Sequence, residues 1–152
     1  MWVIDANLLL YAYDDQSPWH GEARVWLEQL LSEQELVGIP WQSVGAFLRI
    51  STHPKLPGMR ASGEKVMRIV SSWEAHPSVW MLAPGARHLF YLREMVLAGQ
   101  ASGPMITDAQ LAALTMEHGG YLCTADRDFG RFPGLRWGNP LVSPSRWKEC
   151  AH

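Results

Sequence analysis

Residues 105–129, MITDAQLAALTMEHGGYLCTADRDF, decide the fold because they read as a helix, a buried strand and an acidic turn in direct succession. Apolar residues recur at helical spacing after Asp108, and the glycine pair that follows them is typical of a helix C-terminus. The apolar run 121–123 then predicts a strand, and the polar turn after it carries Asp126 and Asp128. This stretch therefore places three carboxylates at a helix start and at a strand end.

Strands and helices alternate through the rest of the chain in the same way. Strands are expected at 2–6, 36–39, 79–82, 121–123 and 135–137, and helices are expected to begin near Asn7, Ser17, Trp41, Ser62, Ala86 and Asp108. This alternation predicts an α/β fold of three layers, α/β/α, with a central parallel sheet of about five strands. Because the first and fourth strands can be neighbours in such a sheet, Asp5 and Asp126 are expected to converge at their carboxyl ends.

Local signals also predict how the helices begin and which faces they bury. Asn7 is a good cap for the first helix, Ser17 and Pro18 suit the start of the second, and Ser62 suits the start of a later one. Trp19 and Trp26 fall on the apolar face of the second helix, so both are expected to be buried.

Size and composition favour one domain over residues 1–152. The chain has 152 residues, 47% of them apolar, which is enough for a single full core. It shows no secretion signal and no apolar run long enough to span a membrane, so we expect a soluble, cytoplasmic protein. Cys123 and Cys150 have no metal-binding spacing and are expected to be free thiols. The net charge of −2 does not suggest a broad basic surface for nucleic acid, although clustered carboxylates lower this sum.

Four acids are expected to share the carboxyl edge of the sheet: Asp5, Asp108, Asp126 and Asp128. Like charges gathered in this way need a counter-ion, and an all-oxygen ligand set suits Mg²⁺ or Mn²⁺, whereas the histidines and cysteines show no zinc pattern. A carboxylate cluster loaded with such ions can hydrolyse phosphodiester bonds, as in a nuclease. The same acids also fit a plainer role, because Asp is common as a helix cap and in turns.

Three motifs in this order resemble the PIN domain, and in particular toxins of the VapC type. They are Asp-x-Asn at 5–7, Thr107-Asp108 followed by LAAL, and Thr124-x-Asp126-x-Asp128-Phe129 followed by Phe132-Pro133-Gly134-Leu135. The resemblance covers nearly the whole chain. It implies a PIN-like domain with Mg²⁺-dependent ribonuclease activity, an RNA substrate, a cognate antitoxin of the VapB type that blocks the site, and a homodimer.

The resemblance also assigns roles to individual residues. Asp5, Asp108 and Asp126 match metal-binding acids, Asp128 joins them as a fourth catalytic acid, and Asn7 and Thr124 match positions that support the acids. One position departs from the pattern, because Ala46 stands where the family usually has Glu. Gln42 and Ser43 lie four and three residues earlier, so they can share the helix face of Ala46 and support a water or an ion there.

Other readings of these motifs remain open. A receiver-type signalling domain would need a phospho-accepting Asp after the third strand, where residues 82–85 read LAPG. A dehalogenase-type phosphatase would need Asp in place of Asn7. A degenerate or housekeeping PIN domain that binds RNA or a protein with little or no cleavage is the closest alternative, because the carboxylate at Ala46 is missing.

Overall fold

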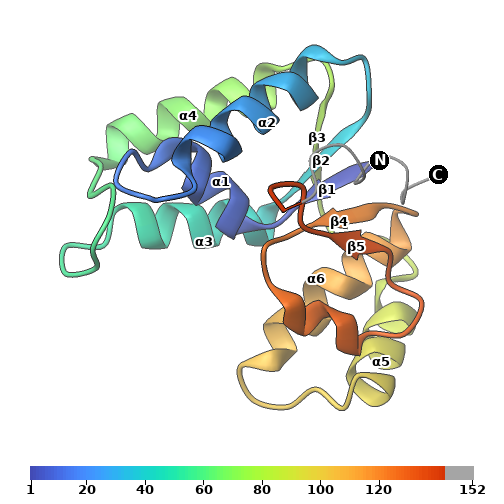
Figure 1. Ribbon diagram of the computed structural model, residues 1–152. Coiled ribbons are helices and arrows are strands. Elements are labelled where there is room, and N and C mark those ends of the chain that lie inside the picture. The colour runs from blue at the N-terminus through green and yellow to red at the C-terminus, as the bar shows by residue number, and fades with distance from the viewer. Residues whose placement is uncertain (143–152) are drawn as a thin grey trace.

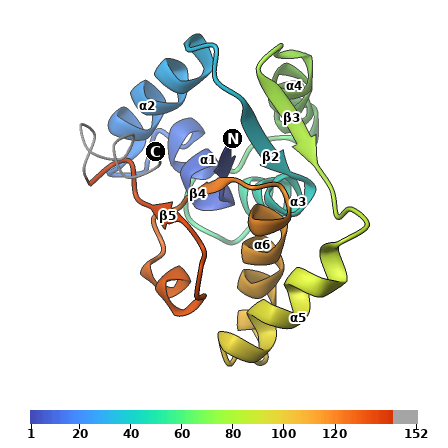
Figure 2. The ribbon, with the colours of Figure 1, turned by 90° about the vertical axis from the view of Figure 1, so that its right-hand side faces the viewer.

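Five short strands form a parallel sheet with helices on both faces in the computed structural model, which describes residues 1–142 (Figures 1 and 2). The sheet order is β3-β2-β1-β4-β5, so β1 and β4 are neighbours as predicted. The strands are β1 Trp2–Ile4, β2 Val37–Pro40, β3 Val79–Leu82, β4 Tyr121–Cys123 and β5 Trp137–Gly138. The helices are α1 Ala6–Tyr13, α2 His20–Ser32, α3 Trp41–Ser51, α4 Gly63–Ala75, α5 His88–Ala98 and α6 Met105–Glu117, with a short 3-10 helix, η1, at Arg127–Arg131.

The two faces of the sheet are covered by separate groups of helices. Because side chains alternate along a strand, Trp2 and Ile4 face the core shared with α1 to α4, and Val3 faces the core shared with α5, α6 and η1. Figure 1 shows these groups on opposite sides of the strands. The predicted three-layer α/β/α architecture with five parallel strands is therefore confirmed.

Several boundaries agree with the local sequence signals. The third and fourth strands cover the predicted residues, 79–82 and 121–123. Helix α4 begins where Ser62 was expected to cap it, and the Ser62 hydroxyl accepts a hydrogen bond of 3.1 Å from the backbone N–H of Lys65. These signals succeed because the groups that satisfy them lie within a few residues of one another.

Four expectations about the helices and strands were wrong. Asp5, not Asn7, caps α1, because its carboxylate accepts from the N–H of Ala6. Helix α2 begins at His20, since the Ser17 hydroxyl accepts from the N–H of Trp19 in a turn that precedes the helix. Trp19 is 45% exposed and lies outside the core that buries Trp26. The fifth strand is also displaced, from 135–137 to Trp137–Gly138.

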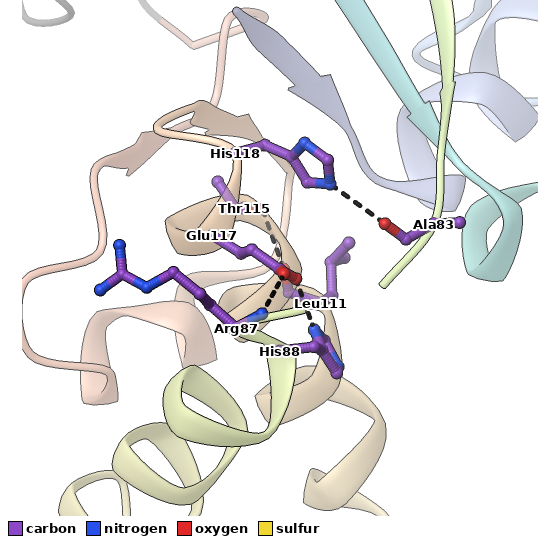
Figure 3. A network of polar contacts seen from close by, with 7 residues as sticks. All are labelled: Ala83, Arg87, His88, Leu111, Thr115, Glu117 and His118. Carbon is purple, nitrogen blue, oxygen red and sulfur yellow. Dashed lines mark hydrogen bonds and ion pairs between the residues drawn. The ribbon is translucent and has the colours of Figure 1, made fainter. Parts of the chain in front are cut away.

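The carboxyl end of α6 is anchored to the loop between β3 and α5 (Figure 3). The Glu117 carboxylate accepts from the N–H of Arg87 at 3.2 Å and lies 3.0 Å from Nδ1 of His88. Nε2 of His118 lies 3.1 Å from the carbonyl oxygen of Ala83. Burial raises the pKa of Glu117, but hydrogen bonds from the backbone of Gly85 and from His88 outweigh burial, so the pKa is lowered. These contacts hold in place the helix that carries Asp108.

The predicted free thiol of Cys123 is confirmed, and this side chain is buried in β4, where burial raises its pKa. Cys150 lies outside the described residues. Within residues 1–142, no helix combines the length and the apolar character needed to cross a membrane.

Candidate functional site

Asp5 lies where β1 passes into α1, directly beside the end of β4. Its backbone N–H donates to the carbonyl of Cys123 at 3.0 Å, which extends the pairing of the two strands by one residue. One carboxylate oxygen accepts from Ala6 N–H at 2.7 Å, and the other accepts from the Thr124 hydroxyl at 2.7 Å. Burial raises the pKa of Asp5, these two hydrogen bonds oppose the rise, and the charge of Asp126 adds to it. The site therefore contains a carboxylate held in one orientation by both of its oxygens.

The Thr124 hydroxyl connects the motifs that follow β1 and β4. Thr124 is fully buried, and besides donating to Asp5 its oxygen accepts from the Asn7 amide at 3.2 Å and from the Asp126 N–H at 3.0 Å. The Asn7 carbonyl oxygen in turn accepts from the N–H of Ala125 at 3.4 Å. Asn7 and Thr124 thus link the two strand ends that carry the acids.

Asp126 lies between β4 and η1, and Asp128 lies in the first turn of η1. Asp126 caps η1, because its carboxylate accepts from the N–H of Asp128 at 2.8 Å. Asp126 is half-buried and Asp128 is exposed. The turn is anchored by Phe129, which is 1% exposed in the core beneath α6. The start of this short 3-10 helix therefore presents two acids that differ in their access to solvent.

Asp108 enters the site from the first turn of α6. Burial raises its pKa, and the negative charges of Asp126, Asp5 and Asp128 raise it further, in that order, while Arg131 opposes them. The four predicted acids therefore share one electrostatic environment, although they come from three separate parts of the chain. A cation placed among them would relieve this repulsion.

Helix α3 forms the opposite wall of a pocket of about 260 Å³ that contains Asp5 and Asp108. Ala46 lines this pocket, so the helix face expected from the sequence does point toward the acids. The pocket lining comprises Asp5, Ala6, Gln42, Ser43, Gly45, Ala46, Arg49, Thr107, Asp108 and Leu111. Arg49 is the charged member of this lining that sequence reasoning did not place at the site, although its position one turn after Ala46 was a signal for it.

Gln42 and Ser43 both bind the backbone beside an acid. The Gln42 amide donates to the carbonyl of Thr107 at 2.7 Å, directly before Asp108. The buried Ser43 hydroxyl donates to the carbonyl of Ile4 at 2.9 Å, directly before Asp5. These two side chains therefore fasten α3 to the two backbone segments that present Asp5 and Asp108.

The donor chemistry of the site suits a hard divalent cation, because its charged ligands are carboxylates. Within residues 1–142, no three Asp, Glu, His or Cys side chains are grouped closely enough to share one ion. Asp5 and Asp126 instead direct oxygens toward Thr124 and backbone N–H groups. Each carboxylate oxygen carries two lone pairs, so these bonds leave capacity for a further partner. The residues thus fit an ion by charge and ligand type.

Comparison with known proteins shows similarity over most of the chain. Residues 2–135 match the family model described as PIN domain. The chain is 36% identical over 140 residues to "Ribonuclease VapC37" of Mycobacterium tuberculosis, covering 92% of this chain and 97% of that protein. It is 33% identical over 142 residues to "Ribonuclease VapC25" of the same organism, covering 93% and 100%.

Solved structures show the same fold at low sequence identity. The VapBC2 structure from Rickettsia felis, bound to a DNA fragment from its promoter, matches with a TM-score of 0.69 at 16% identity and covers 91% of this chain and 97% of that chain. VapC20 of Mycobacterium tuberculosis, described as a sarcin-ricin loop cleaving toxin, matches with a TM-score of 0.65 at 14% identity and covers 90% and 99%.

Proposed function

The chain belongs to the PIN domain family, and we propose that it is an endoribonuclease, the toxin of a VapC-type toxin/antitoxin pair. The proposal is supported by a pocket that Asp5 and Asp108 line together, by the charge of Asp126 that acts on Asp108, and by relatives that are named ribonucleases. The charges of both other acids raise the pKa of Asp108, which supports a shared site for the three carboxylates.

We assign the metal to Asp5, Asp108 and Asp126, with Mg²⁺ or Mn²⁺ as the ion and Asp128 as a fourth catalytic acid at the open side. When bound, such an ion supplies a Lewis acid and a water activated for attack on phosphorus. Thr124 orients Asp5 through the 2.7 Å hydrogen bond, and Asn7 keeps the Thr124 hydroxyl directed toward that carboxylate. Gln42 and Ser43 support the site through the backbone beside the acids.

We also propose a partner and a compartment. Solved relatives of this fold include VapBC complexes, so the expected partner is a small antitoxin of the VapB type that covers the acidic pocket. A homodimer is the assembly that the family resemblance implies. Because the substrate is RNA, the expected compartment is the cytoplasm.

Cleavage of RNA by the purified protein tests this function. In the hydrolysis we expect, the water oxygen bonds to phosphorus and the bond from phosphorus to the 3′ oxygen breaks, which leaves a 3′-hydroxyl and a 5′-phosphate. Cutting should require Mg²⁺ or Mn²⁺ and stop with EDTA. A cyclic 2′,3′-phosphate product, or cutting that persists in EDTA, would contradict the metal-dependent reaction.

Matched variants assign the activity to the site. Asp126→Asn should lower kcat/KM by about 10²-fold or more, because removal of one preorganised charged group commonly costs this much. Asp15→Asn removes an exposed acid outside the pocket and should leave the rate unchanged. Equal rates for the two variants would place the chemistry elsewhere.

A further inference from the structure

Helix α3 presents a row of four residues to the acidic pocket: Gln42, Gly45, Ala46 and Arg49. Their spacing of three and four places them along one side of two helical turns. Gln42, at the amino end, is fixed by its hydrogen bond to the carbonyl of Thr107. Arg49, in the last turn, extends the row beyond Ala46. The pocket wall therefore runs from the neighbourhood of Asp108 to an arginine.

Among residues 1–142, Arg49 is the only cation in the pocket lining, and it faces the same space as two acids. Its side chain forms no ion pair within residues 1–142, where the ion pairs are Arg24–Glu28, Arg68–Glu64 and His88–Glu117. It is exposed, so binding an anion would not require a buried contact to be broken. A guanidinium in this position can bind phosphate through two parallel N–H donors.

Small side chains leave the wall between the acids and Arg49 open. A Cβ atom added at Gly45 would meet no atom within 4 Å, so the space beside this residue is free. Ala46 contributes only a methyl group where the family pattern has a carboxylate. A Glu at 46 would lie three residues before Arg49, at the spacing at which opposite charges pair on a helix. Ala46 therefore leaves the guanidinium available.

We propose that Arg49 binds a backbone phosphate of the RNA next to the one that is cleaved, with Gly45 and Ala46 providing room for the strand. This inference rests on the proposed ribonuclease function and adds a residue that positions its substrate. The acids repel a polyanion, and a cation on the opposite wall of the same pocket attracts the strand while the cleaved bond lies at the acids.

Kinetics of Arg49→Gln provide the first test, with Arg68→Gln as the matched control. Arg68 is an exposed arginine of α4 outside the pocket, paired with Glu64. Arg49→Gln should raise KM for RNA by about tenfold with kcat within about twofold, because a contact to a flanking phosphate is equally strong in the ground and transition states. Arg49→Lys should recover part of the loss, and Arg68→Gln should behave as wild type. If both Gln variants have the same KM, Arg49 does not bind the substrate.

Binding of single-stranded RNA in EDTA provides a readout that does not depend on cutting. Loss of one phosphate contact should reduce the slope of log K against log salt by about 0.7 for a single strand. Ala46→Glu should give a similar reduction, since the new carboxylate would pair with Arg49. An unchanged slope in Arg49→Gln would refute the inference. If wild-type protein fails to cut RNA, the proposed function falls while this binding measurement still decides the role of Arg49.

Discussion

Replacement of Thr124 by Val should destabilise the protein by removing the hydroxyl that links the two strand ends. This substitution keeps the shape of a fully buried side chain and deletes three hydrogen bonds, of 2.7, 3.0 and 3.2 Å. Loss of the hydrogen bond to the Asp5 carboxylate should cost about 1.5–3 kcal/mol. The Asn7 amide and the Asp126 N–H lose their acceptor, which should cost about 1 kcal/mol each because water can partly replace the hydroxyl. The free energy of unfolding should fall by roughly 3.5–5 kcal/mol, which lowers Tm by about 7–20 °C.

Thr115→Val is the matched control for this substitution. Thr115 is equally buried, and its hydroxyl makes one hydrogen bond, of 2.9 Å, to the carbonyl of Leu111 within α6. Its loss should cost about 1 kcal/mol. Urea unfolding of the metal-free proteins measures both values, and Thr124→Ser, which keeps the hydroxyl, should retain most of the stability. If the Thr124 and Thr115 valine variants lose equal stability, the hydroxyl network does not hold the strand ends together.

The effect of Thr124→Val should also depend on pH. The Thr124 hydrogen bond lowers the pKa of Asp5, which burial has raised above 3.8, so its loss should raise this pKa further. A carboxyl group with a raised pKa in the folded state destabilises the fold as pH rises through that pKa. The stability lost in Thr124→Val should therefore be larger at pH 7 than at pH 4. A loss that does not change with pH would show that Asp5 does not depend on this hydroxyl.

Three further perturbations address the metal site and the anchoring of α6. Ala46→Glu adds a carboxylate to the pocket and should tighten Mn²⁺ or Mg²⁺ binding by about three- to tenfold in calorimetry, and an unchanged affinity would show that position 46 does not reach the ion. Asp108→Asn should raise Tm of the metal-free protein at pH 7 by roughly 1–3 °C. The pKa of Asp108 is raised above 3.8, so its charge opposes folding once pH exceeds that pKa, and the gain should vanish below about pH 4. Glu117→Ala should cost about 1–3 kcal/mol, because it strands the donors of Arg87 and His88, and urea unfolding with no change in midpoint would contradict that role.

The order and type of the elements were largely determined by the sequence. Continuous apolar runs mark β3 and β4, and Ser62 marks the start of α4, because burial and capping in these segments involve neighbours in the chain. The positions of Asp5 and Asp126 at strand ends follow from the same local patterns. Their convergence could be predicted once the first and fourth strands were taken as neighbours.

Contacts between distant segments decided the rest. Asn7 suits a cap by residue type, but its amide binds Thr124, more than a hundred residues away, and the capping role passes to Asp5. Trp19 is an exception with a local cause: it has the spacing of a core residue, yet the turn that Ser17 forms with it delays the start of α2 and leaves it exposed. In the sequence, Arg49 is one basic residue among several. The structure places it on the side of α3 that faces Asp5 and Asp108. Local sequence determines which backbone groups need hydrogen-bond partners and which apolar faces must be buried. Only the packed structure determines which distant groups provide those partners, and which side chains remain free to bind a ligand.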